Sequence, residues 1–386
     1  MATTHVFIVD INTFKYHLEY LFAGTGAKEE YIDFNNSSTS KLHHNKENNL
    51  VGMIADACRV RKGDYIIFYL QQNYSQKVYE GKFYGIFRVK DDLSFLDNNY
   101  KGQFLKKELK KSLTFRTLIE PYEVYPKGVT EWEALDEIKH IHSPYQMLWS
   151  LIYRKLKANR GNTMITIYET ERLFKLIRDK NKKKTLNCNG FTFNIDSQEI
   201  KSSQPSSYIG RKEQINLLPR LLGKYKANKS FEIHLQTYLT QNLGRDTNKS
   251  LDKTLLKENN FEWLGNEVYC GVGMQKIDIV LSIPISENKR IVIPIELKSI
   301  YASPDNIIQI QRYVDWLEQY YIPNRISDIQ PVLISLEIKN KNDNYFKAVI
   351  NSFNKFNKKN PNCLPIKFIE FKLEKDNSII FEQINY

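Results

Sequence analysis

Two neighbouring apolar runs, Lys276-Ile-Asp-Ile-Val-Leu-Ser-Ile-Pro284 and Arg290-Ile-Val-Ile-Pro-Ile-Glu-Leu-Lys298, decide how the second half of the chain folds. Both runs are rich in β-branched residues, and the polar stretch between them is typical of a hairpin turn. Each run carries a carboxylate, Asp278 in the first and Glu296 in the second. Lys298 follows Glu296 by two residues, so both side chains point to the same face of the strand. Charges placed beside buried isoleucines must be neutralised, and a divalent metal ion is the usual way.

The size and charge of the chain limit what it can be. A chain of 386 residues is long for one core, so we expect two domains. The formal net charge of +12 favours a polyanionic partner over an acidic or a membrane partner. A lysine-rich surface that is merely solvated would have the same composition, so charge alone leaves the partner open.

Cysteine usage and hydropathy indicate the compartment. The four cysteines are far apart and form no CxxC pair, which favours a reducing environment over a disulfide framework or a zinc site. No stretch reaches the roughly 18 apolar residues of a membrane span, and the N-terminus lacks the pattern of a signal peptide. We therefore expect a cytoplasmic protein with no membrane contact.

The first half of the chain reads as strands followed by helices. We expect strands at 5–10, 65–70, 82–90, 113–119 and 122–125, a loop over the polar tract 35–49, and helices at 144–156 and 169–178. Gly85, inside a strand pattern, indicates a bulge or a close approach of backbone. The basic and serine-rich stretch 179–215 is typical of a linker. The predicted domains are therefore 1–178 and 216–386, with 179–215 between them.

A family resemblance in the first half rests on three pieces. These are Val60-Arg-Lys-Gly-Asp-Tyr-Ile-Ile-Phe-Tyr69, Gly81-Lys-Phe-Tyr-Gly-Ile-Phe-Arg-Val89 and Thr114-Phe-Arg116. Together they resemble the EVE and YTH branch of the PUA-like superfamily. The resemblance implies a β-barrel with helices that binds nucleic acid, in several members by taking a flipped base into an aromatic pocket. A generic β-barrel module whose Gly-Asp turn only connects two strands remains the alternative.

Several residues after the last expected barrel strand could contact nucleic acid. A flipped base needs aromatic faces to replace its lost stacking. Three aromatic residues are candidate walls of such a pocket: Trp132, Tyr145 and Trp149. Aromatic residues more often belong to a core, which is the alternative for each of them. Four cations ending at Gly161 suit contacts to phosphates: Arg154, Lys155, Lys157 and Arg160. A solvated helix end, where cations complement the helix dipole, would carry the same residues.

The order of strands and helices expected in the second half predicts a mixed sheet with helices on its faces. We expect a helix over 230–242 that begins near Glu232, a short helix or loop at 251–259, a strand at 261–270, and then the hairpin. Ser303 reads as the N-cap of a helix with Pro304 at its first position, and this helix ends near Tyr320. A strand at 330–336, a helix at 343–356 and a strand at 366–372 complete the pattern. The predicted class is α/β (α+β).

These residues resemble the PD-(D/E)xK nuclease superfamily. The resemblance rests on Glu232 in a helix, Asp278 in one strand, Glu296-x-Lys298 in the next, and a helix that follows. Gln309 and Tyr313, four residues apart on one face of that helix, form a Q-x-x-x-Y pattern that looks like the RecB-type and NucS-type branch. Lys276-Ile277 stands where the family often has Gly or Pro, which puts the local backbone in doubt. The resemblance implies a restriction-endonuclease-like α/β/α domain.

Phosphodiester hydrolysis gives each of these residues a role. Mg²⁺ or Mn²⁺ on Asp278 and Glu296, with the Leu297 carbonyl as a third ligand, would neutralise the phosphoryl oxygens and activate water. Lys298 would hold or deprotonate that water or stabilise the charged transition state. Glu232 could bind a second metal ion or a water. By the resemblance, Gln309 and Tyr313 would orient the phosphate, the lysine or the active-site strand. In the alternative interpretation, Asp278 and Glu296 are charges on edge strands that deter aggregation. The apolar runs around them indicate central strands instead.

The function that follows is an Mg²⁺-dependent endonuclease acting on double-stranded DNA. With no Walker A motif it needs no ATP, which fits a type II or modification-dependent restriction enzyme whose N-terminal domain selects the site. One active site per chain predicts a homodimer for double-strand cleavage. A NucS-like repair nuclease for mismatched or branched DNA is the alternative enzyme. A nucleic-acid-binding protein that uses the fold only as a scaffold is the alternative of another class.

Overall fold

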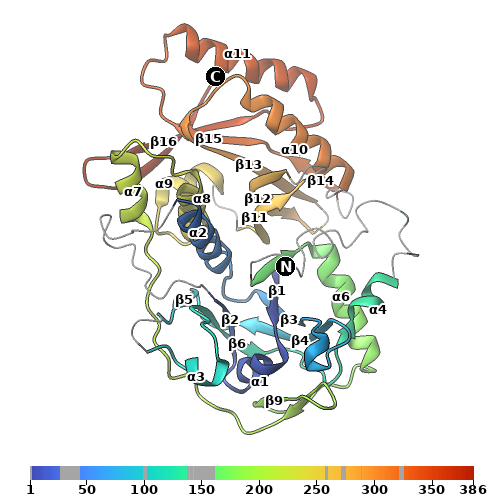
Figure 1. Ribbon diagram of the computed structural model, residues 1–386. Coiled ribbons are helices and arrows are strands. Elements are labelled where there is room, and N and C mark those ends of the chain that lie inside the picture. The colour runs from blue at the N-terminus through green and yellow to red at the C-terminus, as the bar shows by residue number, and fades with distance from the viewer. Residues whose placement is uncertain are drawn as a thin grey trace. The chain divides into compact units, whose positions relative to one another are not determined.

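The computed structural model of the protein describes residues 2–26, 44–98, 102–136, 139, 142, 161–256, 260–270, 275–287, 289–320 and 326–386. The chain forms two compact units (Figure 1). Unit 1 comprises residues 1–33 and 56–215, and unit 2 comprises residues 34–55 and 216–386. Within the described ranges, no helix combines the length and the apolarity needed to cross a membrane.

In the described part of unit 1, the core is one eight-stranded sheet, and the helices lie in the connections between the strands. Its strands pair in the order β2-β6-β4-β3-β1-β8, β5 adds to β6, and β7 adds to β4. The strands are β1 (Thr4–Val9), β2 (Phe22–Thr25), β3 (Tyr65–Leu70), β4 (Lys82–Val89), β5 (Phe95–Leu96), β6 (Phe115–Pro121), β7 (Val129–Thr130) and β8 (Asn162–Ile165). The helices are α1 (Ile11–Glu19), α3 (Lys106–Leu109), α4 (Glu131–Asp136), α6 (Ile167–Lys180) and the short 3₁₀ turn Tyr74–Gln76.

Local sequence explains the boundaries of the main helices of unit 1. The carboxylate of Asp10 accepts hydrogen bonds from the N–H groups of Asn12 and Thr13, so it caps α1. Thr166 and Glu169 form a capping box at the start of α6. This helix is the one expected at 169–178, and the structure extends it by two residues at each end. The helix expected at 144–156 lies outside the described residues.

The expected linker at 179–215 belongs to unit 1. It contains the hairpin of β9 (Phe191–Asn194) and β10 (Glu199–Ser202). Phe191, Phe193 and Ile200 are buried in the same hydrophobic cluster as the sheet residues of unit 1. The polar composition between these three apolar residues resembles a linker, whereas their burial makes the segment part of the fold.

Unit 2 is a mixed sheet between two groups of helices. Its strands pair in the order β11-β12-β13-β15-β16-β17, and β14 adds to β13. The strands are β11 (Trp263–Tyr269), β12 (Lys276–Ser286), β13 (Lys289–Tyr301), β14 (Ile326–Ile329), β15 (Val332–Leu336), β16 (Lys367–Leu373) and β17 (Ile379–Ile384). The helices are α2 (His44–Cys58, whose residues to Ala55 belong to this unit), α7 (Leu218–Lys226), α8 (Glu232–Asn242), α9 (Lys249–Leu255), α10 (Asn306–Tyr320) and α11 (Asn344–Lys359). These elements confirm the predicted mixed α/β class.

The two faces of the unit 2 sheet carry different helices. Alternate residues of β12 and β13, such as Ile279 and Ile295, pack with leucines of α7, α8 and α9 in one hydrophobic cluster. The opposite face is covered by α10 and α11, as Figure 1 shows. The aromatic contact between Phe353 of α11 and Phe368 of β16, with ring centroids 5.2 Å apart, belongs to that opposite face. Because side chains alternate along a strand, Asp278 and Glu296 face α10.

Several expectations for helix boundaries and segments differ from the structure, among them the strand expected at 122–125, where the chain is irregular. The tract 35–49 was expected as a loop, but α2 begins at His44. The helix expected to start at Pro304 begins at Asn306, two residues later. The backbone N–H of Ser303 donates to the side-chain oxygen of Asn306 at 2.7 Å, which is one half of a capping box. β14, β17 and α7 have no counterpart in the sequence expectations.

Candidate active site

The two carboxylates of the hairpin lie where the ladder between their strands ends. β12 and β13 pair antiparallel as far as Ile279 and Ile295. Beyond this pair, a side chain replaces the backbone carbonyl as the acceptor. Oδ2 of Asp278 accepts a hydrogen bond from the backbone N–H of Leu297 at 2.8 Å. The hairpin therefore holds Asp278 beside the backbone that carries Glu296.

Glu296 is fully buried and held from two sides. The ammonium of Lys298 lies 2.5 Å from its Oε1. From α10, the hydroxyl of Tyr313 donates to its Oε2 at 2.6 Å. The amide of Gln309 in turn donates to the Tyr313 hydroxyl at 2.7 Å. The Q-x-x-x-Y pattern of the sequence thus acts on the carboxylate of the active-site strand.

Helix α8 approaches the same site from the other side. Oε1 of Glu232 lies 3.9 Å from the Lys298 ammonium, and its Oε2 accepts from the backbone N–H of Ser299 at 3.4 Å. Gln236, one turn further along α8, donates from Nε2 to the backbone carbonyl of Asp278 at 2.7 Å. Sequence reasoning missed Gln236. Its only signal is its position four residues after Glu232, on the same face of the helix.

Burial and mutual repulsion change the acidity of this cluster. Burial, and then the charge of Glu296, raise the pKa of Asp278 well above its usual range. Burial also raises the pKa of Glu296, although the Lys298 ammonium works against this shift. Burial alone would lower the pKa of Lys298, but the Glu296 charge outweighs it and raises the pKa overall. The strands therefore bring two carboxylates together at a place that favours an added cation.

The chemistry of these donors fits a hard divalent cation. Glu296 Oε1 is buried, and the ammonium of Lys298, 2.5 Å away, is its counter-charge. Within the described part of the chain, no group of three or more His, Cys, Asp or Glu side chains is arranged to hold a metal. A pair of carboxylates is nevertheless the usual protein contribution to Mg²⁺ binding, because water and substrate phosphates complete the shell. Leu297, expected as a third ligand through its carbonyl, lies in β13 with its side chain in the core and its N–H on Asp278.

A pocket lies beside this cluster along α10. Its volume is about 380 Å³, and its walls include Gln309 and Tyr313, the two residues that connect α10 to Glu296. Lys276 and Arg312 supply positive charge to the lining, and Asp305 supplies one negative charge. The pocket therefore offers space next to the carboxylates with more cationic than anionic groups around it.

Most candidate nucleic-acid contacts of unit 1 cannot be placed. Tyr145, Trp149, Arg154, Lys155, Lys157 and Arg160 lie outside the described residues. Trp132 lies in α4 with 60% of its surface exposed, so it is no core residue. Tyr74 and Tyr79, which the sequence reasoning did not single out, are 68% and 61% exposed, and their ring centroids are 6.1 Å apart. Exposed aromatic side chains are thus present on this unit.

Comparisons with known proteins leave the family open. No protein-family model and no curated protein matches the chain. Among solved structures, human THYN1 in complex with 5-methylcytosine containing DNA is similar to part of it, at 8% sequence identity and a TM-score of 0.25. That similarity covers 47% of this chain and 99% of the THYN1 chain. At this TM-score it decides neither the fold nor the function of either unit.

Proposed function

We propose that the protein is a metal-dependent endonuclease that hydrolyses phosphodiester bonds of double-stranded DNA. In this proposal unit 2 carries the catalytic site and unit 1 selects the DNA site, as in a restriction or modification-dependent restriction enzyme. The observation that carries the proposal is the joining of Asp278, Glu296 and Lys298 at the end of the β12–β13 ladder, with Tyr313 bonded to Glu296. The sequence separates these groups by up to 35 residues, and the fold brings them into one site.

The carboxylates have the role of holding the cation. Asp278 and Glu296 would bind Mg²⁺ or Mn²⁺ with oxygen atoms, and Glu232 stands nearby to hold a water molecule or a second ion. The chemistry that the bound ion supplies is neutralisation of charge on the phosphoryl oxygens and activation of water near neutral pH. Tyr313 and Gln309 fix the orientation of Glu296, so the ligand geometry is set before the substrate arrives.

Lys298 has a different role. Its ammonium is already paired with Glu296, which makes it a hydrogen-bond donor at the site. A donor in this position can hold the attacking water and stabilise negative charge that develops on the phosphate. Gln236 keeps the Asp278 backbone in place from α8 and is a positioning residue.

The test is cleavage of plasmid DNA, from both methylated and unmethylated sources, with Mg²⁺ or with EDTA. We expect cleavage by the native protein only with the metal ion, and a loss of about a hundredfold or more in Asp278→Ala and in Lys298→Ala. Asp376→Ala serves as a matched control, because this aspartate lies in an exposed turn of the same unit and, among the described residues, its side chain bonds to the nearby Ser378.

A readout besides activity separates a lost metal site from a lost fold. Titrating Mn²⁺ into the native protein should raise its unfolding temperature, because binding to the folded state alone stabilises it. Asp278→Ala should fold and show no such rise. Cleavage that persists in Asp278→Ala would remove the site assignment, and cleavage that depends on mismatches or flaps would favour a repair nuclease.

A further inference from the structure

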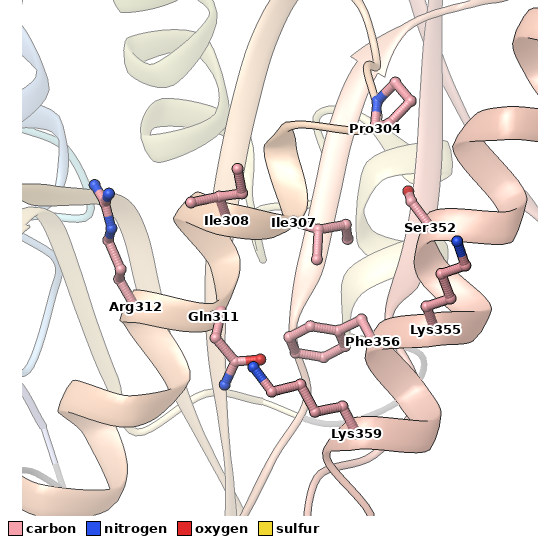
Figure 2. A pocket seen from close by; sticks show the side chains of 9 residues that line it. All are labelled: Pro304, Ile307, Ile308, Gln311, Arg312, Ser352, Lys355, Phe356 and Lys359. Carbon is pink, nitrogen blue, oxygen red and sulfur yellow. The ribbon is translucent and has the colours of Figure 1, made fainter.

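A groove between α10 and α11 lies next to the candidate active site. The roles proposed above for the catalytic residues do not involve this groove. Its volume is about 440 Å³. Its lining residues come from the two helices and the segment before α10: Pro304, Ile307, Ile308, Gln311, Arg312, Ser352, Lys355, Phe356 and Lys359. Figure 2 shows Ile307 and the ring of Phe356 between the helices, with Lys355 and Lys359 coming from α11. The groove thus has an apolar floor and cationic walls.

The groove adjoins the pocket at the active site across α10. Ile308 and Arg312 line both spaces. Arg312 extends from α10 on the side away from α11 (Figure 2), toward the pocket that contains Gln309 and Tyr313. A polymeric substrate that reacts at Glu296 could therefore extend across α10 into the groove.

The charges of the two linings favour an anionic occupant. Lys276, Arg312, Lys355 and Lys359 are cations, and Asp305 is the one acid among the residues that line these two spaces. Lys276 pairs with Glu267, but among the described residues no carboxylate pairs with Arg312, Lys355 or Lys359, and all three are exposed. Unpaired cations spaced along a groove suit a row of phosphates, because each one releases counterions when it meets a phosphate.

The walls of the groove are fixed at both ends. The side chains of Gln311 and Asn360 exchange two hydrogen bonds of 2.9 Å between α10 and the end of α11. At the other end, the Tyr345 hydroxyl donates to the carbonyl of Ala302 at 2.7 Å. A groove held in this way loses little conformational entropy when it binds a ligand. Ile308, 57% exposed on its rim, offers an apolar contact for a sugar or an unstacked base.

We propose that the α10–α11 groove binds the phosphodiester backbone of the DNA strand beside the scissile phosphate. Arg312 lies at the junction with the active site, and Lys355 and Lys359 contact the next phosphates. The contacts are to the backbone, so they contribute affinity and position without reading the sequence. This inference rests on the proposed nuclease function and names how unit 2 holds its substrate.

The experiment measures binding of a labelled 30-base-pair duplex to the full chain in EDTA, by fluorescence anisotropy, over a range of salt concentrations. For Lys355→Ala/Lys359→Ala we expect a loss of affinity of roughly tenfold at low salt and a decrease of about two in the slope of log K against log salt. Cleavage with Mg²⁺ should show a higher KM and an unchanged kcat, because the changed residues do not reach the reacting atoms.

The matched control is Lys347→Ala/Lys358→Ala, which removes the same charge from exposed positions of α11 outside the groove lining. We expect its salt slope to equal that of the native protein. Equal effects of the two double variants, or a native salt slope in Lys355→Ala/Lys359→Ala, would overturn the groove proposal. If the native protein cleaves DNA in either of these cases, the nuclease function stands. If the native protein neither binds nor cleaves DNA, both proposals fail.

Discussion

At the residue scale, the charged and polar side chains of the candidate active site could be assigned from the sequence. Asp278, Glu296 and Lys298 were assigned to one site from strand alternation, the hairpin and the nuclease resemblance, and the structure brings them together. Gln309 and Tyr313 were assigned from helical spacing and the nuclease resemblance, which implied that they orient the phosphate, Lys298 or the active-site strand; in the structure they bond to each other and to Glu296 of that strand. These patterns are short-range, so a sequence carries them directly.

Residues whose role depends on a partner far along the chain could not be placed in this way. Glu47 lies in a polar tract, yet it is buried and accepts hydrogen bonds from Arg220 and His234, at 2.6 and 2.9 Å. Lys224 lies 3.3 Å from its second oxygen. Burial alone would raise the pKa of Glu47, but the bonds from Arg220 and His234 hold this pKa far below its usual range. No local pattern reveals such a pairing, because the partners are more than 170 residues away.

A buried histidine gives unit 1 a predictable response to acid. His17 is buried, its Nδ1 lies 3.0 Å from the Phe22 carbonyl, and burial lowers its pKa to about 3. Below about pH 6.5 the unfolded chain takes up a proton that the folded protein does not. Stability should therefore rise with pH and fall by about 1.4 kcal/mol per pH unit as the pH drops from 6.5 toward 3.

The variant His17→Gln tests this origin, because glutamine can donate to the same carbonyl and does not titrate in this range. Urea unfolding of the two proteins at pH 7 and pH 5 should show a smaller loss of stability in the variant. His142→Asn, at an exposed position, should respond to pH as the native protein does. Parallel stability curves for the native protein and His17→Gln would exclude His17 as the source.

At the element scale, strong periodic segments were predicted better than their ends. The hairpin, α6, α8 and α11 occur where apolar periodicity placed them. The start of α10 was placed two residues too early, at Pro304 instead of Asn306, although the side chain of Asn306 bonds back to the Ser303 N–H as in one half of a capping box. β17 was missed because the apolar residues of Ile379–Ile384 do not alternate regularly with polar ones. Its burial comes from long-range contacts, by pairing with β16 and by packing of Ile379 and Phe381 with leucines of α9.

The bulge in β4 makes a prediction at the same scale. The β3–β4 register shifts between Ile66 and Phe68, and Gly85 has a φ of +71°. A Cβ on Gly85 would lie 2.2 Å from a ring carbon of the buried Phe87. The expectation of a bulge or close approach at Gly85 is therefore confirmed. We expect Gly85→Ala to destabilise the protein by about 1–3 kcal/mol through backbone strain, with a further cost from the displaced ring.

Gly63→Ala separates the two costs. Gly63 has a φ of +83°, and a Cβ there would meet no atom within 4 Å. This variant should show the backbone strain alone and a smaller decrease in unfolding temperature than Gly85→Ala. Equal decreases would mean that Phe87 moves without cost.

At the scale of the whole molecule, the chain does not divide into consecutive domains. Residues 34–55 belong to unit 2 although the chain on both sides of them belongs to unit 1. Sequence composition places a boundary where polar residues gather, which suggested 179–215, but the hairpin there is buried in unit 1. Membership in a unit is decided by long-range burial, and composition does not record it.

This organisation predicts how unit 2 behaves when it is cut from the chain. A fragment of residues 216–386 lacks Glu47, so Arg220, Lys224 and His234 lose their buried acceptor. The Thr237 hydroxyl also loses its bond to the Val51 carbonyl at 3.2 Å. Removing one member of a buried ion pair costs about 3–5 kcal/mol, a large part of the stability of a domain.

We therefore expect the fragment 216–386 to be poorly folded by circular dichroism, and a peptide of residues 34–58 added in trans to restore its thermal transition. A Glu47→Ala form of the same peptide should restore it much less, because helix α2 would then bring no carboxylate to Arg220 and Lys224. Glu47→Ala in the full chain should lower the stability of unit 2 in the same direction. A fragment that folds as stably as unit 2 of the intact protein would show that α2 is dispensable, and that the consecutive boundary at 216 describes the folding unit after all.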